Sequence, residues 1–132
     1  MSFDIIVYQA KPISTQTIAQ AWAAIGNATA YGDCVVVEAA RGRLFAHLNN
    51  LIDRPDCLSD VDEDELAAIR AIAEPTYNFD IQSSDPELLI EGFLRFPSSG
   101  PAAVDNDNGF IGPLAEARKL AEQGARWLGM EG

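Results

Sequence analysis

The residues best suited to chemistry are seven carboxylates within residues 53–65, where Arg54 is the only basic residue. They are Asp53, Asp56, Asp60, Asp62, Glu63, Asp64 and Glu65. One or two acids satisfy the positive end of a helix, whereas five within residues 60–65 repel one another. The excess favours an electronegative surface that binds a basic protein partner. A solvated helix start that only keeps the protein soluble is the simpler interpretation of the same residues.

A second acidic constellation resembles the beginning of a calcium-binding loop. Residues 105–109 are Asp-Asn-Asp-Asn-Gly, and Glu116 stands at the twelfth position of such a loop. However, Phe110 occupies the sixth position, where the loop requires glycine, and a strand rather than a helix is expected before it. The Asn-Gly pair of a β-hairpin explains the same residues. We therefore predict a hairpin and leave cation binding by Asp105, Asp107 and Glu116 open.

Nucleophilic and zinc chemistry have little support in this chain. His47 is the only histidine, and Cys34 and Cys57 are the only cysteines. Nothing local supports a Cys57–His47 nucleophile pair, Cys34 beside three valines is expected in the core, and no zinc-ligand spacing occurs. We therefore expect no catalytic residue, metal or cofactor. A small enzyme whose site is assembled from dispersed residues such as His47, Asp80 or Asp105 stays an alternative.

Local patterning predicts the strands and helices that must position these residues. Runs or alternations of β-branched and aromatic residues predict strands at 3–9, 34–39, 43–49, 76–82, 102–105 and 109–111. Helices are expected from Ser14 to a left-handed stop at Gly26-Asn27, from a capping box of Asp60 and Glu63, over 86–95, and from Pro113. The order β-α-β-β-α-β-α-β-β-α predicts an α+β fold with helices packed on a single-layer mixed or antiparallel sheet.

Composition bounds the possible partners. The 132 residues include 20 acidic and 9 basic side chains, which gives a net charge of −11. A chain of this length buries roughly two-thirds of its surface, enough for one domain over residues 1–132. Residues 50–94 hold twelve of the acids and only two of the bases. Nucleic acid and anionic membrane are not expected as partners, because both require a basic surface.

We expect a cytoplasmic location. The first ten residues lack the basic start and long apolar run of a signal peptide. No apolar run approaches the roughly 18 residues of a transmembrane helix. Two cysteines are too few for a disulfide framework, and free thiols suit a reducing compartment.

The opening strand Phe3-Asp4-Ile5-Ile6-Val7-Tyr8, followed by Lys11-Pro12, resembles the start of small acidic bacterial cytoplasmic proteins of the toxin-immunity type. The resemblance covers these residues together with size, acidity and α+β order. It implies stoichiometric binding of a toxin domain, often a basic nuclease, through acidic surface, and it transfers no site residues. The leading hypothesis is a non-enzymatic protein-binding module. A small enzyme and a self-associating structural or regulatory protein are the alternatives, and the oligomeric state is left open.

Overall fold

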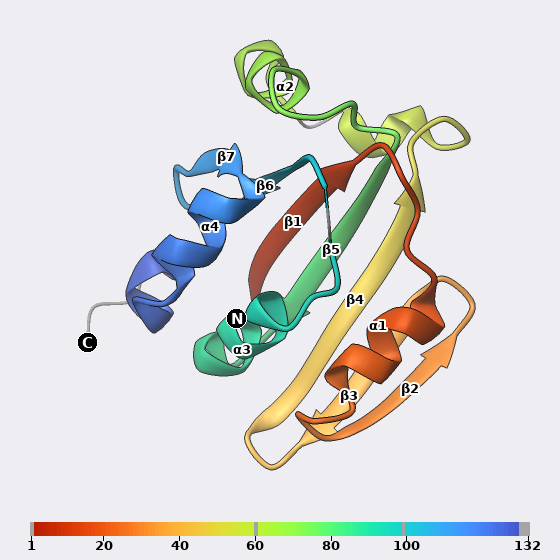
Figure 1. Ribbon diagram of the computed structural model, residues 1–132, viewed down its shortest axis with the longest axis vertical. Coiled ribbons are helices and arrows are strands. Elements are labelled where there is room, and N and C mark those ends of the chain that lie inside the picture. The colour runs from red at the N-terminus through yellow and green to blue at the C-terminus, as the bar shows by residue number, and fades with distance from the viewer. Residues whose placement is uncertain (1, 60, 99, 130–132) are drawn as a thin grey trace.

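Seven β-strands of the described residues form one antiparallel sheet in the order β2-β3-β4-β5-β1-β6-β7 (Figure 1). This computed structural model describes residues 2–59, 61–98 and 100–129. The strands are β1 (Phe3–Gln9), β2 (Asn27–Tyr31), β3 (Cys34–Ala39), β4 (Gly42–Asn50), β5 (Tyr77–Ser83), β6 (Ala102–Asp105) and β7 (Ile111–Pro113). Because β1 pairs with β5 on one side and with β6 on the other, the first strand of the chain lies inside the sheet.

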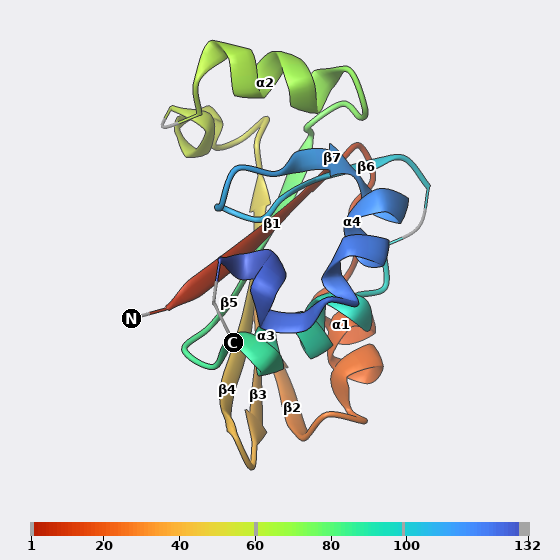
Figure 2. The ribbon, with the colours of Figure 1, turned by 90° about the vertical axis from the view of Figure 1, so that its left-hand side faces the viewer.

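Helices cover the two faces of this sheet unequally. One face carries α1 (Thr15–Trp22), α3 (Pro86–Leu94), α4 (Leu114–Ala121) and the 3₁₀ turn η2 (Gly124–Leu128). On the opposite face, α2 (Glu63–Arg70) and the 3₁₀ turn η1 (Pro55–Leu58) lie at one end (Figure 2). No helix within the described residues is long and apolar enough to cross a bilayer.

The main core forms where alternate residues of the central strands point toward α1, α3 and α4. Ile5 of β1 and Phe79 of β5 are fully buried there. The indole Nε1 of Trp22 donates a hydrogen bond of 2.9 Å to the carbonyl oxygen of Gly92, which ties α1 to α3. A Cβ at Gly92 would collide with the side chain of Leu44, so this glycine lets α3 approach β4 closely.

A smaller core lies under α2 on the other face of the sheet. Its buried residues are Tyr8 of β1, Leu51, Ile69 of α2 and Ala103 of β6. Ile69 is the one buried residue of α2, whereas α3 buries five. Since burial of apolar surface is the main stabilising term in folding, α2 is held far less firmly than α3.

The predicted α+β fold, with helices packed on an antiparallel sheet, is confirmed. One additional strand, β2, was not predicted. The first helix ends at Trp22 with Ala23 in right-handed backbone, and Asn27 begins β2 rather than forming a left-handed stop with Gly26. Residues 27–31 alternate between small half-buried and exposed side chains, a pattern too weakly apolar to be recognised as a strand.

The other predicted elements are present, but the start of α2 and the start of β7 each lie two residues further along the chain than predicted. The first turn of α2 begins after Asp62, not Asp60, and Asp60 lies outside the described residues. Two overlapping D-x-x-E frames exist here, but only the frame from Asp62 places Val61 and Leu66 at the positions of a hydrophobic staple. The last hairpin pairs Asp105 with residue 111, so its loop is longer than a two-residue Asn-Gly turn.

Candidate functional site

Four of the predicted binding acids form the start of α2. Asp62 is the N-cap, and Glu63, Asp64 and Glu65 occupy the first turn. The Asp62 backbone N–H lies 3.4 Å from Glu65 Oε1, which closes one half of a capping box. The first three side chains are exposed and Glu65 is half-buried. None of the four takes part in an ion pair with another described residue.

The remaining predicted acids do not join this group. Asp53 lies in the turn after β4, and Asp56 lies in η1. Both are exposed, and Asp56 Oδ2 lies 3.6 Å from Arg54 Nη2. An exposed ion pair of this kind contributes little to stability. Asp60 falls outside the described residues, so the structure tests neither its place nor its contacts.

Asp64 and Glu65 face the loop between β6 and β7 across a groove of about 470 Å³. The opposite wall carries Asp105 and Asp107, and Phe110 also lines the groove. The two acidic segments are about 40 residues apart in the chain, and the sheet order brings them together because β6 lies beside β1 under α2. Four carboxylates from two distant segments therefore share one groove.

The acidic surface continues from the groove onto the sheet. Ile6 of β1 pairs with Asp80 of β5 on one side and with Asp105 of β6 on the other. Asp4 stands two residues before Ile6 and therefore points from the same face of the sheet. Cross-strand diagonal neighbours are roughly 7–8 Å apart, so three neighbouring strands carry three carboxylates close to one another.

Burial and mutual repulsion disturb the ionisation of these carboxylates. Burial, followed by the charges of Asp80 and Asp107, raises the pKa of Asp4 to about 6. Burial is also the main cause that raises the pKa of Asp80 and of Asp105, and Glu65 adds to the effect at Asp105. The Oδ1 atoms of Asp4 and Asp80 are buried without a hydrogen-bond partner. No ion pair among the described residues neutralises any of these groups.

The loop between β6 and β7 is held by the hydrogen bonds of a buried asparagine. Asn106 is buried, and its Oδ1 accepts hydrogen bonds from the backbone N–H groups of Asn108 and Phe110 at 2.9 and 3.1 Å. Its Nδ2 donates to the carbonyl oxygen of Trp127 at 2.7 Å. Glu116 lies exposed in the first turn of α4 and does not line the groove. The described residues contain no group of three or more side chains arranged to hold a metal.

The structure corrects the predicted cysteine environment. Cys34 is half-exposed rather than part of the core, and its Sγ lies 3.1 Å from His47 Nδ1. His47 also pairs with Asp80 across β4 and β5, so a thiol, an imidazole and a carboxylate occupy adjacent strands. Cys57, the cysteine that the sequence analysis considered as a partner of His47, packs against the smaller core. The two-residue period could have revealed this, because buried Val35 places Cys34 on the opposite face.

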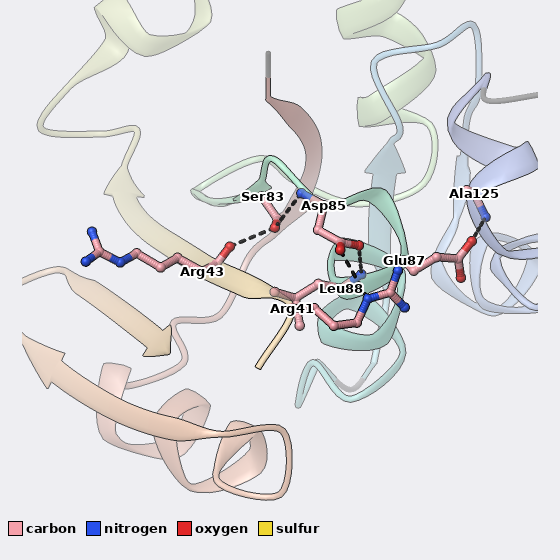
Figure 3. Close-up of polar contacts among 7 residues, drawn as sticks. All are labelled: Arg41, Arg43, Ser83, Asp85, Glu87, Leu88 and Ala125. Carbon is pink, nitrogen blue, oxygen red and sulfur yellow. Dashed lines mark hydrogen bonds and ion pairs between the residues drawn. The ribbon is translucent and has the colours of Figure 1, made fainter. Parts of the chain in front are cut away.

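The acids at the start of α3 differ from those of α2, because the fold uses them (Figure 3). Asp85 Oδ1 accepts from the Leu88 backbone N–H at 3.0 Å, and its Oδ2 lies 3.1 Å from Arg41 Nε. Ser83 Oγ accepts from the Asp85 N–H at 3.1 Å. Glu87 Oε1 accepts from the Ala125 N–H at 3.0 Å, which ties α3 to η2. The acids of α3 cap the helix and also bind distant segments, whereas the acids of α2 cap only their own helix start, through Asp62 and Glu65.

Comparisons with known proteins leave the candidate site to be judged on its own geometry. No family model, no curated protein and no solved structure matches this chain.

Proposed function

We propose that this protein is a non-enzymatic protein-binding module that docks a basic protein partner on its acidic face. The observation that carries the proposal is the groove between α2 and the β6–β7 loop, where Asp64, Glu65, Asp105 and Asp107 converge. None of them pairs with a cation from the described part of the chain. An unneutralised carboxylate cluster opposes folding, so a positively charged partner would relieve repulsion within the folded protein.

The partner class that we propose is a basic toxin domain, for which this protein would act as the immunity protein. The resemblance of the opening strand to toxin-immunity proteins supports this assignment. Burial, followed by the charges of nearby acids, raises the pKa of two polar residues of that strand, Asp4 and Tyr8. Inhibition would require only that the acidic face cover the basic surface with which the toxin holds its own substrate.

The experiment compares the wild-type protein with a variant in which the start of α2 is neutralised. The substitutions are Asp62→Asn, Glu63→Gln, Asp64→Asn and Glu65→Gln, which keep capping groups at both ends of the capping box. Both proteins serve as bait in the native host, and the association rate of the captured basic protein is then measured against salt. We expect the variant to associate about tenfold more slowly at low salt and with a flatter salt dependence.

The matched control changes two acids outside the groove, Asp53→Asn and Asp56→Asn. This variant should associate more than half as fast as the wild-type protein, because neither residue lines the groove. Equal association rates for the wild-type protein and the α2 variant would overturn the proposal. If no partner is captured and the molecular mass instead rises with protein concentration, self-association replaces partner binding as the function.

A small thiol-dependent enzyme is the second candidate function, and one contact favours it. Cys34 Sγ lies 3.1 Å from His47 Nδ1, a distance at which imidazole can accept the thiol proton and activate the sulfur. Iodoacetamide labelling tests this contact, with Cys57 as the internal control in the same chain. Faster labelling of Cys34 than of Cys57, slowed by His47→Asn, would support the enzyme. Equal rates in both proteins would eliminate it.

A further inference from the structure

The two edges of the sheet differ in how they are protected. β7 is only three residues long, ends at Pro113 and packs against α2. Short length, proline and a covering helix all hinder an edge strand from pairing with another chain. β2, at the opposite edge, has five residues and contains neither proline nor a charged side chain. Figure 1 shows β2 as the outermost strand, so its free edge is open to a further strand.

The turn after β2 determines which backbone groups of this strand point outward. Tyr31 and Cys34 flank the two-residue turn Gly32-Asp33, so they form a hydrogen-bonded pair. Such pairs alternate along an antiparallel ladder, so the N–H and C=O groups of Ala28 and Ala30 point away from β3. Outside the β2–β3 ladder, no backbone hydrogen bond joins either alanine to another described residue. The edge therefore offers donors and acceptors in the spacing of a β-ladder.

The sequence of β2, Asn-Ala-Thr-Ala-Tyr, is nearly symmetric about its middle residue, Thr29. In a two-fold antiparallel pairing centred on Thr29, Ala28 of one copy pairs with Ala30 of the other. This register satisfies every outward backbone group of both alanines. It also places Asn27 directly opposite Tyr31 of the second copy. Tyr31 is 59% exposed in the single chain, so the pairing covers aromatic surface as well.

Charge favours a second copy of this chain as the occupant of the edge. Residues 12–32, which include α1 and β2, contain no charged side chain, although 22% of the chain is charged. Since α1 packs against β2 and β3, the surface beside the edge is uncharged as well. Two copies with a net charge of −11 repel each other least where charge is absent. We propose that two copies pair through β2 and join their sheets into one continuous sheet.

This inference goes beyond the proposed function and does not depend on it. β2 and the β6–β7 hairpin lie at opposite ends of the strand order, so the pairing leaves the acidic groove of each copy open. The dimer would therefore carry two separate partner-binding sites.

Sedimentation equilibrium tests the pairing on the wild-type protein. Because a contact through one strand is small, the series covers protein concentrations from about 10 μM to about 1 mM. We expect the mass to rise from 14.2 kDa toward twice that value. Thr29→Lys changes an exposed side chain and places two like charges directly opposite each other. It should raise the dissociation constant of the dimer at least about fivefold.

The matched control is Ile52→Lys, which adds the same charge at an exposed position in the turn after β4. It should leave the dissociation constant within about twofold of the wild-type value. Both variants reduce the net negative charge equally. A weaker dimer of Thr29→Lys alone therefore reports the position of the lysine and not the total charge.

Cysteine crosslinking tests the register and keeps the test valid if Thr29→Lys does not fold. In a protein with Cys34→Ser and Cys57→Ser, Thr29→Cys brings two thiols into a non-hydrogen-bonded pair with Cα atoms about 4.5 Å apart. This distance suits a disulfide, so oxidised glutathione should link the two copies. Asn27→Cys is the control, because its two copies lie about 13 Å apart along the paired strands and should stay unlinked.

Two outcomes would overturn the pairing through β2. One is the mass of a single chain at every concentration. The other is a rise in mass that Thr29→Lys leaves unchanged, because the copies would then meet at another surface. Either result leaves the protein-binding function standing, since the association rate of the α2 variant tests the acidic groove by itself.

Discussion

The starts of α2 and α3 are both acidic, yet their carboxylates make different contacts. Asp85 and Glu87 at the start of α3 each accept a backbone hydrogen bond, and Asp85 also pairs with Arg41. Asp64 and Glu65 at the start of α2 instead border a groove opposite two further carboxylates. The helix dipole favours acids at both starts equally. What distinguishes them is whether a distant segment of the fold supplies a partner, because at α2 the only contact is the capping box of Asp62 and Glu65.

The comparison shows that the number of acids at a helix start does not indicate their role. α3 has fewer acids, and each is bound to a group far away in sequence, so they stabilise the fold. α2 has more acids, buries a single residue, and adds charge to a region that is already repulsive. The acids at α2 therefore make no contact with a distant segment of the described chain, a pattern consistent with the partner binding proposed above.

The largest predicted effect concerns the acid that the fold uses most. Asp85→Ala removes the N-cap of α3 and its ion pair with Arg41. We expect a loss of about 2 kcal/mol in the free energy of unfolding, mainly from the cap. Urea denaturation at pH 7 measures this loss. Asp64→Ala changes an exposed acid at the start of α2 and should alter the free energy of unfolding by less than about 0.5 kcal/mol. A loss as large as that of Asp85→Ala would remove the distinction between the two helices.

The next effect concerns Asp4, whose pKa is raised from 3.8 to about 6 by burial and by the neighbouring charges of Asp80 and Asp107. The folded protein then binds more protons than the unfolded chain between about pH 4 and 6, so stability falls as pH rises through this range. Asp4→Asn removes this fall. After allowance for solvent screening, we expect a gain of about 1 kcal/mol at pH 7.

The measurement for Asp4 is a series of urea denaturations from pH 4 to pH 7. The stabilities of the wild-type protein and Asp4→Asn should converge toward pH 4 and separate above pH 6. A constant difference at all pH values would show that Asp4 is not the titrating group. Asp53→Asn, an exposed acid distant in sequence from β1, is the control and should leave the pH profile unchanged.

The smallest effect on stability is expected for the fourfold amide variant of α2. Neutralising Asp62, Glu63, Asp64 and Glu65 removes favourable dipole interactions but also relieves repulsion across the groove. These contributions oppose each other, so thermal stability in moderate salt should change by less than about 0.5 kcal/mol. At low salt the variant should be the more stable protein, because repulsion is then unscreened. A loss of more than 2 kcal/mol would mean that these acids support the fold after all.

The sequence predicted the architecture better than the site. Periodicity and caps located most strands and all four α-helices, because local spacing determines which residues share a face. β2 was missed because Ala28 and Ala30 bury too little surface to mark a strand. The frame of α2 was misplaced because Asp60-x-x-Glu63 and Asp62-x-x-Glu65 match the same pattern. The hydrophobic staple from Val61 to Leu66 could have decided between them.

The groove itself had no local signature. Glu65 and Asp105 face each other only because β1 lies between β5 and β6, an arrangement of strands that short-range patterns do not specify. Asp80 and Asp105 were recognised as candidate site residues, but Asp4 and Tyr8 were not. Burial among other carboxylates raises the pKa of both residues, and this burial becomes visible only in three dimensions.

The position of Trp127 gives the molecule an optical reporter. Its ring packs edge-on against Phe110 at a centroid distance of 5.6 Å, and Phe110 lines the groove. Trp22, the other tryptophan, is fully buried and bonded to Gly92 in the main core. Occupancy of the groove should therefore change the fluorescence of Trp127 while Trp22 provides an unchanging internal reference. Binding can be followed in solution without any label, and Trp22→Phe and Trp127→Phe variants would separate the two emissions.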